Sequence, residues 1–89
     1  MNWRLDFSNR SLKFIQQNNL DFDFIVGRVG SALKKFQGEN VNVDIKKLGG
    51  DWKGFYRIRS GKLRIIIEFD FEKSVAYIDA IDWRGSVYR

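Results

Sequence analysis

The sequence contains neither cysteine nor histidine among its 89 residues. Without cysteine, the chain forms no disulfide and offers no thiolate ligand to a metal ion. Without histidine, it lacks the usual zinc ligand and the side chain that most often acts as a general base near neutral pH. A Ser-His-Asp or Cys-His mechanism within this chain is therefore excluded, and we expect neither a metal site nor a cofactor.

Long hydrophobic runs are also missing. No apolar stretch approaches the roughly 18 residues that a membrane-spanning helix requires. The N-terminal residues Met1–Phe7 alternate in polarity like a strand and do not resemble a signal peptide. From these features we expect a cytoplasmic protein in a reducing environment, without a membrane partner.

The length and the charge limit the class of protein. Its 89 residues suffice for one domain with a modest core, so we treat residues 1–89 as a single domain. Sixteen Lys and Arg residues against eleven Asp and Glu residues give a net charge of +5. This excess favours a polyanionic partner, such as nucleic acid or an acidic protein. The alternative is a basic protein whose charge serves only its solubility.

The N-terminal half predicts one strand and two helices. Alternating polarity predicts a half-buried strand over Asn2–Phe7. Ser8 has the character of a helix N-cap and precedes a short helix over Asn9–Gln17, with Leu12 and Ile15 facing inward. A second helix follows, with apolar residues at spacings of three and four. These residues are Phe22, Ile25, Val26, Val29, Leu33 and Phe36.

Charged residues and glycines mark the ends and the interior of this second helix. Asp21 and Asp23 lie at its start, and Gly38 follows its end as a C-cap. Gly27 and Gly30 lie inside it, where glycine lowers helix stability. Close packing against a neighbouring element is the usual explanation for such glycines, and contact with a partner protein is the alternative.

The C-terminal half predicts a meander of strands. Residues Gln37–Gly50 read as a polar loop that includes a short extended piece at Val41–Ile45. Three strand candidates follow, with short connections at Ser60-Gly61 and Asp70–Lys73 that favour antiparallel hairpins. These candidates are Lys53–Arg59, Lys62–Phe69 and Ser74–Ile81. The predicted class is α+β: an antiparallel sheet, made of the N-terminal strand and the C-terminal meander, with two helices packed on one face.

Three arginines share the other face of this predicted sheet. With a two-residue turn at Ser60-Gly61, Arg57 lies directly across from Arg64, and Arg59 lies on the same face. Like charges in such a pair are destabilising. One interpretation is that acidic neighbours, Glu68 and Asp79, neutralise the cluster. The other is that the arginines are held ready for an anion such as a phosphate backbone, which the planar guanidinium binds well.

The last seven residues, Trp83–Arg89, are basic and aromatic with little core character. We expect this segment to fold over the arginines, because it follows a strand of the same sheet. Aromatic rings beside arginines form stacking sites for unpaired RNA bases. The alternative is that Tyr88 packs as an anchor for the C-terminus.

Several of these residues belong to a motif in the C-terminal half. The motif reads Lys47-Leu48, Gly54-Phe55-Tyr56-Arg57-Ile58-Arg59-x-Gly61, Arg64-Ile65-Ile66 and Ile81-x-x-Arg84-x-x-Val87-Tyr88. This motif resembles that of the RelE/ParE toxin superfamily of bacterial type II toxin–antitoxin systems. The N-terminal order of strand, two helices and basic loop agrees with that superfamily.

The resemblance implies a ribosome-dependent endoribonuclease that cleaves mRNA without a metal, by attack of a 2′-hydroxyl on the adjacent phosphate. In this scheme Arg64 and Arg84 bind the scissile phosphate, and Arg57 and Arg59 position the backbone and the developing charge. Tyr88 stacks on a base or transfers a proton. Further RNA contacts are expected from Lys46, Lys47, Lys53, Lys62, Trp83 and Arg89.

The resemblance also implies the partners: the ribosome, mRNA and a cognate antitoxin protein. We expect a monomer when the chain is alone and a hetero-oligomer with the antitoxin. Two alternatives stay open. One is a ParE-like toxin that inhibits DNA gyrase without chemistry of its own, and the other is a weakened homologue that only binds RNA.

Overall fold

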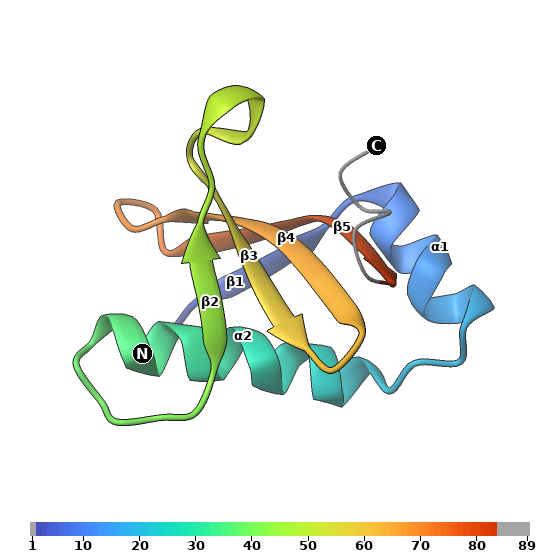
Figure 1. Ribbon diagram of the computed structural model, residues 1–89, viewed down its shortest axis with the longest axis horizontal. Helices are drawn as coiled ribbons and strands as arrows, with labels where there is room; N and C mark the ends of the chain where they lie inside the picture. The colour runs from blue at the N-terminus through green and yellow to red at the C-terminus, as the bar shows by residue number, and fades with distance from the viewer. Residues whose placement is uncertain (1, 84–89) are drawn as a thin grey trace.

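The computed structural model describes residues 2–83, which form a five-stranded sheet and two helices (Figure 1). In chain order the elements are β1 (Arg4–Phe7), α1 (Asn9–Gln17), α2 (Phe22–Phe36), β2 (Asp44–Lys47), a 3-10 turn η1 (Gly50–Trp52), β3 (Phe55–Ser60), β4 (Leu63–Asp70) and β5 (Val75–Trp83). The strand order in the sheet is β1-β5-β4-β3-β2. Both helices contribute to one apolar core against one face of the sheet, which confirms the α+β class.

The sheet is antiparallel except at one edge. β1 runs parallel to β5, with Arg4 opposite Val75 and Phe7 opposite Ile78. A parallel pair requires a long crossover, and here the whole chain from α1 to β4 supplies it. The sequence therefore predicted the strands of the meander correctly but not the direction of this one pairing.

Helix α1 begins and ends where the sequence predicted, but a different side chain faces inward. The Ser8 hydroxyl accepts a hydrogen bond from the Ser11 backbone N–H at 3.1 Å, as an N-cap does. Ser11 and Ile15 are buried, whereas Leu12 is 44% exposed, so its predicted inward position is wrong. The small Ser11 allows the helix to approach β5, and its hydroxyl donates to the Ser8 carbonyl oxygen at 2.8 Å.

Helix α2 has the predicted ends. The Asp21 carboxylate caps it by accepting from the Asp23 N–H at 3.0 Å. Past its C-terminus, Gly38 has a φ of +89°, and its N–H donates to the Lys35 carbonyl at 3.0 Å. The N–H of Glu39 donates to the Lys34 carbonyl at 3.1 Å, which completes the two hydrogen bonds of a Schellman motif.

The buried stripe of α2 is narrower than the predicted one. Ile25, Val29 and Ala32 are buried, whereas the outer members of the predicted stripe are 36–45% exposed. These outer members are Phe22, Val26 and Phe36. A methyl group added at Gly27 or Gly30 would meet no atom within 4 Å among residues 2–83, so close packing within that range does not explain these glycines.

The segment before β3 contains a strand that the sequence analysis placed too early. β2 covers Asp44–Lys47 and pairs antiparallel with β3 at the sheet edge, so it overlaps the expected extended piece at Val41–Ile45 only at Asp44 and Ile45. Within the polar run Gln37–Gly50, only a four-residue strand forms, and tertiary pairing sets its bounds. After β2 the chain folds across the sheet, where Leu48, Trp52 and Phe55 cover Ile66 and Ala80.

In the β3–β4 hairpin, the pairing register differs by two residues from the predicted register. Ser60 pairs with Leu63, so the turn residues are Gly61-Lys62, and Gly61 adopts a φ of +60°. Arg59, not Arg57, therefore lies opposite Arg64, and Arg57 lies opposite Ile66. Because the shift is an even number of residues, every side chain keeps its predicted face.

None of the helices within residues 2–83 has the length and apolar character needed to cross a membrane.

Candidate anion-binding face

The sheet face opposite the helices brings four charged residues into one row. Strand register places Asp44 of β2 opposite Arg59 of β3, Arg59 opposite Arg64 of β4, and Arg64 opposite Asp82 of β5. The two like charges at the centre are thus flanked by a carboxylate on each side. We refer to Arg57, Arg59 and Arg64, with the neighbouring Lys46, as the arginine face.

Asp44 holds two of the three arginines. Its Oδ1 accepts a hydrogen bond from Arg57 Nη2 at 2.8 Å, and its Oδ2 lies 2.7 Å from Arg59 Nε. The Arg57 side chain is 17% exposed, compared with 41% for Asp44 and 50% for Arg59. The bridge therefore has one largely buried member and two members that water reaches.

The neutralising carboxylate is not one that the sequence analysis named. Asp79 was expected to reach this face, but it lies 2.7 Å from Arg10 Nη2 of α1, so that expectation is wrong. Arg10 Nε also donates to the Asp79 carbonyl at 3.0 Å. Glu68 lies opposite Phe55 and forms no ion pair with any residue in the described range 2–83. Asp44 was missed because the sequence analysis did not predict that its segment pairs with β3.

Among the three arginines, Arg64 is the one without a carboxylate partner within residues 2–83. Its Nη1 donates to the carbonyls of Gly61 at 3.0 Å and Leu63 at 3.3 Å, so the guanidinium lies over the β3–β4 turn. Within residues 2–83, no carboxylate lies within ion-pair distance of it. Neutral carbonyls orient this side chain without cancelling its positive charge.

Only one of the four predicted lysines shares a face with the arginines. Lys46 lies opposite Arg57 in the adjacent strand and is exposed. Lys47, the next residue in β2, points to the other side of the sheet. Lys53 lies in the connection after η1, and Lys62 lies in the β3–β4 turn; both are exposed.

Trp83, an aromatic member of the predicted site, lies away from the arginine face. The Trp83 ring packs beside Phe14 of α1 at a centroid distance of 5.7 Å, and its Nε1 donates to Asn18 Oδ1 at 3.3 Å. Trp83 is therefore turned toward α1 rather than toward the arginines. Arg84, Tyr88 and Arg89 lie outside the described residues, as does the expected folding of the C-terminal segment over this face.

A different aromatic pair borders the arginine face. Phe55 precedes Arg57 by two residues on the same face of β3, and its ring meets that of Trp52 edge-on at 5.6 Å. The alternation of side-chain faces along β3 could have predicted from the sequence that Phe55 lies on the same face as Arg57. Trp52 is brought there by the chain turn around η1, which no local pattern indicates.

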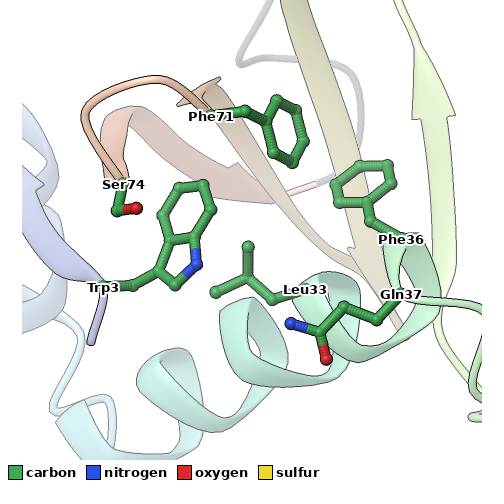
Figure 2. A pocket seen from close by; sticks show the side chains of 6 residues that line it. All are labelled: Trp3, Leu33, Phe36, Gln37, Phe71 and Ser74. Carbon is green, nitrogen blue, oxygen red and sulfur yellow. The ribbon is translucent and has the colours of Figure 1, made fainter. Parts of the chain in front are cut away.

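A separate apolar pocket lies on the helix side of the sheet (Figure 2). It has a volume of about 360 Å³ between the end of α2, the residue before β1 and the β4–β5 turn. Its lining is Trp3, Leu33, Phe36, Gln37, Phe71 and Ser74. None of the arginines of the arginine face lines this pocket, so the two surfaces are chemically and spatially distinct.

The described residues also contain no group of three or more acidic side chains arranged to hold a metal ion.

Comparison with solved structures identifies the fold. A toxin from Helicobacter pylori, solved with bound metal, is 16% identical and superposes with a TM-score of 0.73 over 97% of this chain and 99% of its own. The archaeal RelE–RelB complex from Pyrococcus horikoshii contains a chain that is 25% identical, with a TM-score of 0.61 over 97% and 99% of the two chains. The YoeB–YefM complex from Staphylococcus aureus gives 16% identity and a TM-score of 0.63 over 94% and 99%.

Neither a protein-family model nor a curated protein sequence matches this chain. The similarity is therefore carried by the three-dimensional arrangement, which extends over nearly the full length of each neighbour. By their names these neighbours are toxins or toxin–antitoxin complexes, so the shared arrangement is a RelE-like toxin fold. This chain has that fold, which confirms the resemblance seen in its sequence motif.

Proposed function

We propose that this protein is the toxin of a type II toxin–antitoxin system and that it stops translation by cleaving mRNA on the ribosome. The observation that carries the proposal is the arginine face: three arginines from two adjacent strands on the helix-free side of a RelE-like sheet. Guanidinium groups suit phosphate, because they stay charged and donate two parallel hydrogen bonds.

The chemistry that we propose is an internal transfer at phosphorus. The 2′-oxygen of one nucleotide bonds to the adjacent phosphorus while the bond from phosphorus to the leaving 5′-oxygen breaks. The 2′-hydroxyl loses its proton to a base, and the leaving oxygen gains one. Negative charge builds on the non-bridging oxygens, where Arg64 and its neighbours would stabilise it more strongly than in the ground state.

The arginines are assigned to charge stabilisation and positioning rather than to proton transfer. An arginine keeps its proton throughout the physiological pH range, so it is a poor general base. Proton transfer and base stacking are proposed for Tyr88, and a second phosphate contact is proposed for Arg84. Lys46 would contact the RNA backbone beside Arg57, where the sheet register brings the two together.

The proposal includes a cognate antitoxin as a partner. Two of the similar structures are toxin–antitoxin complexes by their names, which supports such a partner for this chain. A predominantly acidic antitoxin segment covering the arginine face would block phosphate binding and complement the net charge of +5.

A cell-free translation reaction with mapping of mRNA 5′ ends tests the proposal, alongside a reaction that holds mRNA without ribosomes. We expect cuts only with translating ribosomes and a loss of at least a hundredfold in cleavage rate for Arg64→Ala. Arg4→Ala is the matched control, because Arg4 is an exposed arginine on the same sheet face at the opposite edge. Intact mRNA together with undiminished protein synthesis would refute the ribonuclease proposal and direct attention to gyrase supercoiling.

A further inference from the structure

The bridge between Asp44 and two arginines has the geometry of an occupied anion site. One carboxylate oxygen lies 2.8 Å from Arg57 Nη2, and the other lies 2.7 Å from Arg59 Nε. A phosphodiester carries the same single negative charge and also presents two terminal oxygens to guanidinium donors. In the free protein, Asp44 therefore takes the place on Arg57 and Arg59 that a backbone phosphate would need.

The members of the bridge differ in how firmly the fold holds them. Arg57 is largely buried, and its Nε atom is buried without a hydrogen-bond partner among residues 2–83. The protein thus encloses most of this guanidinium, and its Nε can still donate a hydrogen bond to an incoming acceptor. Asp44 is 41% exposed and lies on a four-residue strand at the sheet edge, so water can solvate its carboxylate when another anion replaces it.

We propose that Asp44 is a built-in competitor for the phosphate site of the arginine face. The carboxylate keeps Arg57 and Arg59 oriented and neutralised in the free protein, and an RNA phosphate displaces it on binding. This inference rests on the proposed function in one respect, namely that the ligand of the arginines is an RNA backbone. Its consequence is selectivity, because a polyanion that cannot place a phosphate between these two arginines must bind against the charge of Asp44.

Removal of the carboxylate charge tests the proposal. The probe is a short single-stranded RNA with 2′-O-methyl groups, which lacks the attacking hydroxyl and stays intact. For Asp44→Asn we expect about fivefold tighter binding at about 0.1 M salt, the effect of one charge at close range in a partly hydrated site. We also expect the slope of log K against log salt to steepen by about 0.7, because the site without the Asp44 charge offsets about one more phosphate charge of a single strand.

Asp6→Asn is the matched control for this measurement. Asp6 lies on the same sheet face at the far edge, and it pairs with the exposed Arg4 at 3.1 Å. Both substitutions change the net charge by one unit, so they share any effect of overall charge. Equal affinity and equal salt slopes for the two variants would overturn the proposal.

A second measurement uses the unaltered protein, in case Asp44→Asn folds poorly. The carboxyl carbon of Asp44 is followed by NMR while the 2′-O-methyl RNA is added. Displacement predicts a large shift of this resonance in step with the side-chain signals of Arg57 and Arg59. RNA binding that leaves the Asp44 carboxyl resonance unchanged would contradict displacement.

The two proposals fail in different ways. If Asp44→Asn binds RNA more tightly but the protein cleaves no mRNA on ribosomes, the competitor proposal is supported and the ribonuclease proposal is refuted. If mRNA is cleaved on ribosomes but Asp44→Asn and Asp6→Asn bind RNA with equal affinity and equal salt slopes, the ribonuclease proposal is supported and the competitor proposal is refuted.

Discussion

The two faces of the sheet follow different physical rules. On the helix-covered face, Ile58, Ile65 and Ile67 are completely buried against apolar neighbours, so the side-chain pattern alone decides which residues lie there. On the open face, neighbouring residues include Arg57, Arg59 and Arg64, whose environment depends on which acidic residue the register brings beside them. The comparison teaches that a register shift of two residues leaves burial unchanged, whereas it changes which charges pair.

The largest expected effect is on the covered face. Ile65→Ala removes three carbons from a completely buried side chain, and we expect a loss of about 2–5 kcal/mol in the free energy of unfolding. Urea denaturation followed by fluorescence measures this loss. The control is Leu12→Ala on α1, where 44% exposure predicts a loss of less than about 1 kcal/mol. Similar losses for both variants would show that the two residues are not packed as described.

An intermediate effect is expected from the Asp44 bridge. Asp44→Ala leaves the largely buried guanidinium of Arg57 without its carboxylate, and we expect a loss of about 1–2 kcal/mol in unfolding free energy, below that of a fully buried pair because Asp44 is half-exposed. Arg57→Met removes the charge together with its need for a partner and should cost less. The proposal of a structural bridge fails if Asp44→Ala costs no more than Asp6→Ala, whose exposed pair is worth about 0–1 kcal/mol.

The smallest effect should be stabilising. Gly27→Ala and Gly30→Ala each add a methyl group that meets nothing within 4 Å, while the helix gains the better propensity of alanine. We expect a gain of about 0.5–1 kcal/mol for each, measured by thermal or urea denaturation. Gly38→Ala is the control of opposite sign, because its φ of +89° is unfavourable for alanine. Destabilisation by Gly27→Ala would show that something approaches this glycine closely after all.

Much of the fold was predictable because its signals are local. The limits of α1 follow from the Ser8 cap, and those of α2 follow from Asp21 and Gly38, where the structure shows the corresponding hydrogen bonds. The order of the meander strands followed from their alternation and short connections. The predicted sheet face of each side chain in β3 and β4 was also correct. The register of this hairpin is shifted by two residues, and an even shift keeps each side chain on its side of the sheet.

The candidate site was predictable only in part. The shared face of Arg57, Arg59 and Arg64 follows from alternation within two strands, which the sequence contains. Their main carboxylate partner does not, because Asp44 precedes Arg57 by 13 residues and reaches it only through the pairing of β2 with β3. For the same reason, the position of Trp83 against α1 rather than beside the arginines could not be read from its neighbours in the chain.

What the sequence alone determined was the class of the domain, the limits of its helices, the faces of its central strands and the superfamily resemblance. The first three depend on periodicity, caps and turns, which act over a few residues, and the resemblance rests on the residue motif of the C-terminal half. Tertiary structure alone decided the parallel pairing of β1 with β5, the register of the arginine row and the bridge from Asp44 to Arg57 and Arg59. The reason is physical: ion pairs require contact within a few ångströms, and the fold brings residues distant in sequence to that separation.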